Sequence, residues 1–339
     1  MNIENIINKK FGEGTIKKAS DAKEKVLSIP TPSYTINYHS GIGGIGIGYQ
    51  HEIYGAEASG KSALCQGIVA NAQKMGLRCL YIDAENRFQA ERALQFGINI
   101  EDLYLMRETS IESVFNIIPD VLRSGEFQVI VVDSIPVLMS DKEFEEDMET
   151  MDMGKKAQAL GKGLKKVIGV TSEIKSLHPD WVLPTVIYVN QVRNGPDKYT
   201  PEFVPGGRAF GFFCSQIIRL QASKYIDADD KEYSIGANAT NENNLIGVLI
   251  AHRHKKNTFS PPARTGSYKL YWDERCFDNK EELFELALQI GIVKYLSKMS
   301  LQFRDYDKIV GIENMKKFLL NDPQKFQELE SDFWAIAKK

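Results

Sequence analysis

A glycine-rich run of eight residues carries the clearest chemistry in this sequence. Residues 55–62 read Gly-Ala-Glu-Ala-Ser-Gly-Lys-Ser and match the phosphate-loop pattern G-x-x-x-x-G-K-[ST]. In such a loop the backbone N–H groups surround phosphate oxygens, the lysine reaches the β- and γ-phosphates, and the last hydroxyl binds Mg²⁺. The residues expected to bind a nucleoside triphosphate are therefore Gly55, Ala56, Glu57, Ala58, Ser59, Gly60, Lys61 and Ser62.

Two acidic segments supply the other groups that triphosphate hydrolysis needs. Asp133 ends the apolar run 129–132, where a parallel strand would release it beside the nucleotide, so we expect it to hold Mg²⁺ together with Ser62. A helix N-cap is the alternative role for an aspartate at this position. Glu85 and Asp83 both lie near the end of another strand-like segment, where either could orient and deprotonate water. Spacing alone leaves these two carboxylates as competing candidates.

Short apolar strands that alternate with helical patterns must position these groups. The alternation runs from about residue 31 to 270, and the run 129–132 is apolar at every position, as in a strand buried on both faces. The expected strands are 51–54, 78–83, 127–134, 185–191 and 245–252. The pattern predicts an α/β fold in which a mostly parallel sheet is covered by helices.

The two ends of the chain differ from this middle part. The first 30 or so residues combine a short apolar-periodic segment with glycines and end near Pro30 and Pro32, which indicates an arm followed by a linker. From about residue 275 the composition becomes charged and helix-favouring and predicts a small, mainly helical C-terminal domain. The expected division is 1–32, 33–272 and 273–339.

Charge and cysteine content limit the classes of function. The 339 residues include 42 Lys plus Arg and 45 Asp plus Glu, a net charge of −3, which argues against general coating of DNA but not against a local basic surface. Seven acids crowd residues 140–153 and five lysines follow within 155–166; a solvated loop that leads into an amphipathic helix is the ordinary reading. The chain shows neither a C-x-x-C pair nor an apolar run long enough for a membrane span, and we expect a reducing, cytoplasmic location. The four cysteines are Cys65, Cys79, Cys214 and Cys276.

Taken in order, the short motifs resemble those of the bacterial RecA recombinase family over nearly the whole chain. The segments KKFGEGTIKKAS, EIYGAEASGKS, YIDAEN, VIVVDS, YVNQVR, PGGRA and MKKFLLNDPQKFQELE follow one another with the family's spacing. The resemblance implies a P-loop NTPase core of RecA type, an N-terminal polymerisation arm and a small α+β C-terminal domain. It also implies ATP and Mg²⁺ as ligands.

The resemblance assigns roles around the nucleotide. Glu85 takes the position of the family's catalytic glutamate, which resolves the competition with Asp83, and Gln191 takes that of the γ-phosphate sensor. Without the other motifs, Gln191 would be an ordinary strand-end glutamine. Arg92 replaces a tyrosine that stacks on adenine in many relatives. Among the cations at 253–256, Lys256 is the first choice for reaching the γ-phosphate of a neighbouring subunit, with Lys255 and Arg253 as alternatives.

The resemblance also implies two DNA-binding loops, at about 141–153 and 192–205. Tyr199 and Phe203 could stack on bases or serve ordinary loop packing. Gln158 stands where an arginine is expected to approach DNA, and Pro119 interrupts an expected helix, where we predict a kink or a late start. The candidate DNA-binding residues are Arg193, Lys198, Tyr199, Phe203, Gly206, Gly207, Arg208 and Lys165.

The function implied by the resemblance is that of an ATP-dependent DNA recombinase. It forms a homo-oligomeric helical filament on single-stranded DNA, pairs that strand with homologous double-stranded DNA, and acts without a membrane in the cytoplasm, that of a host cell if the source is viral. A ring-shaped helicase of the same fold and a non-enzymatic recombination accessory remain the alternatives. The arm and the Gly206–Gly207 turn fit a helicase poorly, and the set Lys61, Glu85 and Asp133 argues against an inactive accessory.

Overall fold

One large sheet forms the centre of the protein. The computed structural model describes residues 2–12, 16, 18, 20, 25–141, 153–192, 204–235 and 244–338. The strands of this sheet are β3 (Gln50–Gly55), β4 (Cys79–Asp83), β5 (Leu103–Met106), β6 (Val129–Asp133), β7 (Thr185–Gln191), β8 (Gln216–Asp227), β9 (Glu232–Ser234), β10 (Leu245–Asn257) and β11 (Thr265–Tyr271). All five strands expected from the sequence are present, with ends that differ by a few residues from those expected.

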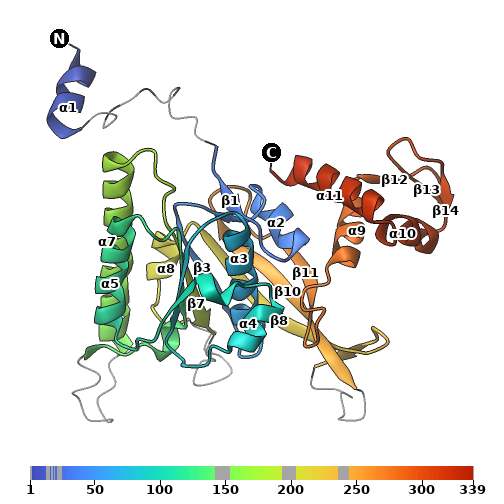
Figure 1. Cartoon of the computed structure of the whole chain (residues 1–339), viewed down its shortest axis with the longest axis horizontal. Helices are drawn as coiled ribbons and strands as arrows, with labels where there is room; N and C mark the ends of the chain where they lie inside the picture. The colour runs from blue at the N-terminus through green and yellow to red at the C-terminus, as the bar shows by residue number, and fades with distance from the viewer. Residues whose placement is uncertain are drawn as a thin grey trace.

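The sheet is parallel at its centre and antiparallel at one side. Across the described ranges its nine strands follow the order β11-β10-β8-β3-β7-β6-β4-β5, with β9 paired to β8. Figure 1 labels five of these strands, β11, β10, β8, β3 and β7. The strands from β8 to β5 pair in parallel, whereas β9, β10 and β11 join as antiparallel neighbours. The carboxyl ends of β3, β4, β6 and β7 therefore lie along one edge, where ligands collect in open α/β sheets.

Helices cover both faces of the sheet. The helices of this region are α2 (Tyr34–Ser40), α3 (Lys61–Lys74), α4 (Ala90–Gln95), α5 (Ile111–Ser124), α7 (Met153–Leu177) and α8 (Ala209–Phe213). Alternate residues of β6 enter two apolar clusters, one shared with α3 and α4 and the other with α5, α7 and α8. Burial on both faces explains why β6 is apolar at every position before its final aspartate.

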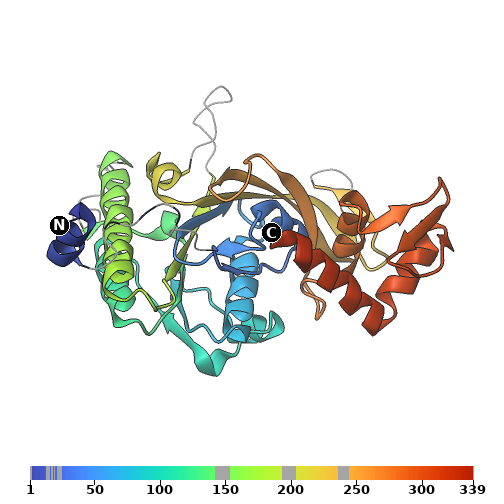
Figure 2. The same cartoon turned by 90° about the horizontal axis from the view of Figure 1, so that it is seen from above.

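The C-terminal part folds around its own apolar cluster. Its elements are α9 (Lys280–Gln289), β12 (Val293–Tyr295), β13 (Ser300–Phe303), β14 (Ile309–Val310), α10 (Ile312–Leu320) and α11 (Pro323–Ala337). The three strands form an antiparallel sheet, so the α+β expectation is confirmed and the mainly helical reading was incomplete. Figure 2 places this part at the opposite end of the molecule from α5, α7 and the N-terminal helix α1 (Ile3–Phe11).

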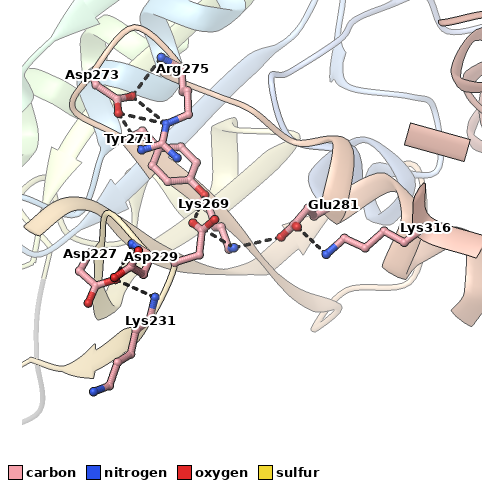
Figure 3. Close-up of polar contacts among 10 residues, drawn as sticks. Asp227, Asp229, Lys231, Lys269, Tyr271, Asp273, Arg275, Glu281 and Lys316 are labelled. Atoms are coloured by element: carbon pink, nitrogen blue, oxygen red, sulfur yellow. Dashed lines mark hydrogen bonds and ion pairs between the residues drawn. The ribbon is translucent and has the colours of Figure 1, made fainter. Parts of the chain in front are cut away.

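Helix α2 and the start of α9 join the core to the C-terminal part. The Tyr34 ring meets Phe333 of α11 edge to face, with ring centroids 5.2 Å apart. The Oε1 atom of Glu282 accepts hydrogen bonds from the hydroxyls of Ser33 and Thr35, both at 2.6 Å. Its neighbour Glu281 bridges Lys269 of β11 and Lys316 of α10 at the surface (Figure 3).

Three smaller features complete the description of the fold. The four cysteines are free and buried. None of the helices in the described ranges is both long and apolar enough to cross a bilayer. A short antiparallel pair, β1 (Ser28–Ile29) with β2 (Ile45–Gly46), precedes the central sheet.

Candidate nucleotide and DNA site

The phosphate loop lies where β3 passes into α3. Ala58 and Gly60 have positive φ values of 55° and 80°. A Cβ atom on Gly60 would lie 2.4 Å from the Ile250 Cδ1 atom, so a side chain at this position would meet both backbone strain and steric overlap. The glycine that the motif demands is thus required by the fold as well as by close approach of a ligand.

The start of α3 is arranged to bind an anion. Gly60 is the N-cap of this 14-residue helix and supplies no capping side chain. The Lys61 ammonium donates hydrogen bonds to the carbonyls of Gly55 at 3.2 Å and Ala56 at 2.6 Å. Burial lowers the pKa of Lys61, while the charges of Asp133 and Glu85 oppose that shift. Phosphate oxygens can replace these carbonyls as better partners for a poorly solvated ammonium.

Asp133 and Ser62 form the oxygen-ligand pair expected for Mg²⁺. Asp133 ends β6, and its Oδ2 atom accepts a hydrogen bond from the Tyr81 hydroxyl at 2.6 Å. Burial raises the pKa of Asp133, and hydrogen bonds from Tyr81 and Ser62 act in the opposite direction. A hydroxyl paired with a carboxylate beside a phosphate loop suits a hard cation that keeps water and phosphate ligands. No group of three or more His, Cys, Asp or Glu among the described residues is arranged to hold a metal ion.

The geometry separates the two competing carboxylates. Asp83 accepts hydrogen bonds from the backbone N–H groups of Arg87 at 3.2 Å and Phe88 at 2.9 Å, so it caps the turn after β4. Glu85 instead lies at the sheet edge, where its Oε1 atom accepts a hydrogen bond from the Ser134 hydroxyl at 2.5 Å. Its charge acts on both Lys61 and Asp133. Glu85 is therefore the better placed of the two for chemistry at the terminal phosphate.

Gln191 lies beside the first glycine of the phosphate loop. It pairs with Gly55 across β3 and β7, and the next residue, Val192, donates its N–H to the Gly55 carbonyl at 3.1 Å. Sequence reasoning missed the preceding Asn190, whose amide donates to Glu52 at 2.8 Å and to the Pro205 carbonyl at 2.9 Å. The signal available in the sequence was an asparagine directly before the glutamine that ends the strand. Asn190 therefore links Pro205, the last residue of the 192–205 loop, to β7 and to Glu52 of β3.

Only part of the expected DNA-binding set can be placed. Arg193, Lys198, Tyr199 and Phe203 lie outside the described residues, as does most of the first loop. Of the remaining members, Gly206 packs against Leu160 of α7, and the exposed Gly207 and Arg208 lead into α8. Lys165 is exposed on α7.

Arg92 and Lys256 both contact carbonyls of their own chain. Arg92 donates hydrogen bonds to the carbonyls of Tyr271 at 3.1 Å and Trp272 at 3.2 Å, and its guanidinium lies 4.5 Å from the centre of the Phe96 ring. The Lys256 ammonium donates to the Gly211 carbonyl of α8 at 2.8 Å. The structure leaves the roles of both residues toward ATP as predictions.

The two other cations of β10 have a different orientation. Arg253 and Lys255 are exposed on one face, alternating with the buried His252 and His254 on the other.

A phosphate loop, a buried strand-end aspartate and a glutamate after a strand, along one edge of a mostly parallel sheet, define a P-loop NTPase fold with a RecA-type core. Comparison with known proteins identifies the family. A family model described as the RecA N-terminal domain matches residues 1–275. Proteins named RecA from Campylobacter jejuni and Heliobacterium modesticaldum are 33% and 31% identical over 329 and 331 residues, covering 95% and 96% of this chain and 89% of each relative. The chain belongs to the RecA family.

Proposed function

We propose that this protein is an ATP-dependent recombinase that forms helical filaments on single-stranded DNA and pairs the bound strand with a homologous duplex. The observation that carries the proposal is the pairing of Gln191 with Gly55. It joins the first residue of the phosphate loop to the segment that enters the 192–205 loop. A change at the terminal phosphate therefore has a short, direct path to a DNA-binding loop.

Hydrolysis would use the groups along the sheet edge. Lys61 and the free N–H groups at the start of α3 hold the phosphates, and Glu85 accepts the proton of the attacking water. Ser62 and Asp133 would hold Mg²⁺, which neutralises charge on the phosphate oxygens when bound. Ser134 keeps the Glu85 carboxylate pointed along the edge through its hydrogen bond to Oε1.

Filament formation would place ATP between two subunits. The exposed Arg253 and Lys255, together with Lys256, are the cations of β10 that could reach the γ-phosphate of a neighbour. The arm helix α1 carries exposed apolar side chains at Ile3 and Ile6, which suit docking on a second copy of the chain. ATP binding then favours the assembled state, and hydrolysis weakens it.

DNA contact would rest on the backbone and on base faces rather than on sequence. Arg193, Lys198, Arg208 and Lys165 are the proposed phosphate contacts, with Tyr199 and Phe203 as stacking groups and Gly206 and Gly207 shaping the turn. Base pairing between the bound strand and the incoming duplex supplies the recognition of homology. The protein is proposed to act in the cytoplasm on single-stranded and double-stranded DNA.

The test is ATP hydrolysis by the purified protein with and without single-stranded DNA, measured beside pairing of a labelled oligonucleotide with a homologous duplex. We expect stimulation of hydrolysis by DNA and ATP-dependent pairing. Duplex unwinding without pairing would favour a helicase, and pairing support without hydrolysis would favour an accessory protein. In a parallel arm, Gln191→Ala should keep basal hydrolysis and lose most of the stimulation by DNA, because it removes the side-chain amide proposed to contact the terminal phosphate and leaves the backbone pairing with Gly55 in place.

A further inference from the structure

The two carboxylate oxygens of Glu85 are held by two different groups. Oε1 accepts the hydrogen bond from Ser134, a residue only 3% exposed. Oε2 lies 3.3 Å from the Arg87 guanidinium, whose side chain is 76% exposed. One oxygen therefore has a rigid, buried partner and the other a solvent-facing partner that can leave.

The turn after β4 brings Arg87 to this position without using its side chain. The Asp83 carboxylate holds the backbone N–H groups of Arg87 and Phe88, and Asn86 takes a positive φ of 54°. The Phe88 ring packs against Tyr81, with centroids 5.3 Å apart, which anchors the far end of the turn. Truncation of the Arg87 side chain should therefore leave the turn and Glu85 in place.

Among the described residues, Glu85 is the only carboxylate within ion-pair distance of Arg87. A general base needs an oxygen directed at the water that it deprotonates. While Arg87 is paired with Oε2, that oxygen is directed at the guanidinium instead. We propose that Arg87 is a gate on the same subunit that restrains Glu85 in the DNA-free protein, and that turnover requires this ion pair to open. The inference rests on the proposed function of Glu85 as the general base.

The expected effect of the Arg87–Glu85 ion pair on turnover follows from its exposure to solvent. An ion pair this accessible to solvent contributes at most about 1 kcal/mol, equivalent to about a fivefold change in the open population. A gate of this strength yields readily to competing charge, such as that of bound phosphates or a filament neighbour. It should slow basal turnover without blocking stimulated turnover.

The experiment compares DNA-free ATP hydrolysis by the wild type and Arg87→Ala at saturating ATP and Mg²⁺. We expect kcat to rise about two- to fivefold with KM little changed, and the ratio of DNA-stimulated to basal rate to fall by the same factor. Arg87→Lys keeps a cation at the site and should restore most of the restraint. Arg123→Ala is the matched control, because it removes an exposed arginine of α5 that pairs with Glu173 of α7 at 3.0 Å. The basal rate of this variant should equal that of the wild type.

Salt gives a second readout that a purely structural role would not produce. Raising the ionic strength from about 0.05 to about 0.5 M screens the exposed pair, so the basal rates of wild type and Arg87→Ala should converge. A basal rate for Arg87→Ala that equals or falls below that of the wild type overturns the gate.

Glu85→Gln distinguishes this failure from that of the proposed function. If Glu85→Gln is inactive and Arg87→Ala is not accelerated, only the gate is wrong. If Glu85→Gln hydrolyses ATP normally, the assignment of the base itself fails.

Discussion

The carboxyl edge of the sheet and the junction between the core and the C-terminal part both hold ionisable side chains, but they satisfy them differently. At the edge, Lys61, Glu85 and Asp133 each have hydrogen-bond partners, and Lys61 and Glu85 are partly exposed. At the junction, several buried polar atoms of described residues have no partner. These atoms are Oε2 of Glu282, Nδ1 of His39, His252 and His254, and Nε2 of His254.

The difference separates groups that serve activity from groups that serve stability. Charges at the edge are placed where a ligand can exchange with their present partners, as the Lys61–carbonyl contacts illustrate. Groups at the junction are enclosed by α2, β10 and α9. Water cannot solvate a charge that forms there, so only neighbouring protein groups can stabilise it. Substitutions at the edge should therefore change rates, and substitutions at the junction should change the free energy of unfolding.

The largest expected effect is the loss of hydrolysis in Glu85→Gln. The amide keeps the size of the side chain and can still accept the hydrogen bond from Ser134, but it cannot take a proton from water. The hydrolysis rate should fall about 10²- to 10⁴-fold, while ATP binding and the thermal midpoint stay close to wild type. Rapid-quench kinetics and ATP titration measure the two quantities. A fall in the thermal midpoint comparable to that of a core variant would contradict the expectation that substitutions at the edge change rates rather than stability.

The second effect concerns stability at the junction. Glu282→Ala removes the acceptor of the Ser33 and Thr35 hydroxyls and of the Thr35 N–H, and it should lower the free energy of unfolding by about 1–3 kcal/mol. Glu282→Gln keeps an oxygen acceptor and should recover most of that loss. Urea unfolding measures both variants, with ATP hydrolysis per folded molecule as the check that activity is spared. An unchanged urea midpoint in Glu282→Ala would show that the hydrogen bonds to Glu282 do not stabilise the fold.

Stability at the junction should also depend on pH through His254. Burial lowers the pKa of His254 to about 4, and the charges of His39 and Arg264 act in the same direction. The unfolded chain then binds the proton more readily, so this stability is fully present above about pH 6.5 and is lost as the pH falls toward 4. Glu282 acts in the opposite sense, because burial raises its pKa to about 7 despite hydrogen bonds from Ser33 and Thr35.

His254→Gln isolates the histidine contribution. The unfolding free energy of the variant relative to wild type should rise as the pH falls from 6.5 to 4, by up to about 1.4 kcal/mol per pH unit. Urea unfolding at half-unit pH intervals measures this slope. A constant difference across that range would show that His254 does not titrate in a buried setting.

The sequence predicted the edge far better than the junction. The phosphate loop and Asp133 follow apolar runs whose ends fix their place, so a local pattern was sufficient to locate them, whereas Gln191 was singled out only by the resemblance. Spacing left Asp83 and Glu85 in competition and the resemblance chose Glu85; the fold adds a physical reason, because the backbone of the turn shows that Asp83 is a cap. The predictions for Arg193 and Lys198 stay untested, because these residues lie outside the described ranges.

Long-range contacts explain what the sequence reading missed. Glu282 meets Ser33 across 249 positions, and no local pattern indicates that a glutamate in a charged helix start will be buried. The long strand β8 was not located, because its exposed and partly buried positions lack the apolar continuity of β6. A late start of the helix at Pro119 was the wrong alternative, since α5 begins at Ile111 with Ser110 as its N-cap and contains the proline.

The smallest expected effect concerns the exposed network that lies beside the buried one. Glu281 pairs with Lys269 at 3.1 Å and with Lys316 at 2.5 Å, and its side chain is 41% exposed (Figure 3). Burial opposes ionisation, but the hydrogen bonds from Lys316 and Lys269 hold the pKa of Glu281 below its usual value. Since water competes for these charges, Glu281→Ala should lower the free energy of unfolding by no more than about 1 kcal/mol.

A double-mutant cycle between Glu281 and Lys316 sharpens this contrast with Glu282, the next residue in the same helix. The coupling energy should be about 0.2–1 kcal/mol at low salt and should shrink at about 0.5 M, because screening acts on exposed pairs. Glu282→Ala, measured in the same urea series, should show a larger loss that is nearly independent of salt, because its partners are buried hydroxyls and a backbone N–H. A coupling above about 2 kcal/mol that resists salt would mean that the surface network, rather than the buried glutamate, fixes the C-terminal part to the core. A salt-sensitive coupling at Glu281 beside a salt-independent loss in Glu282→Ala would instead assign that task to Glu282.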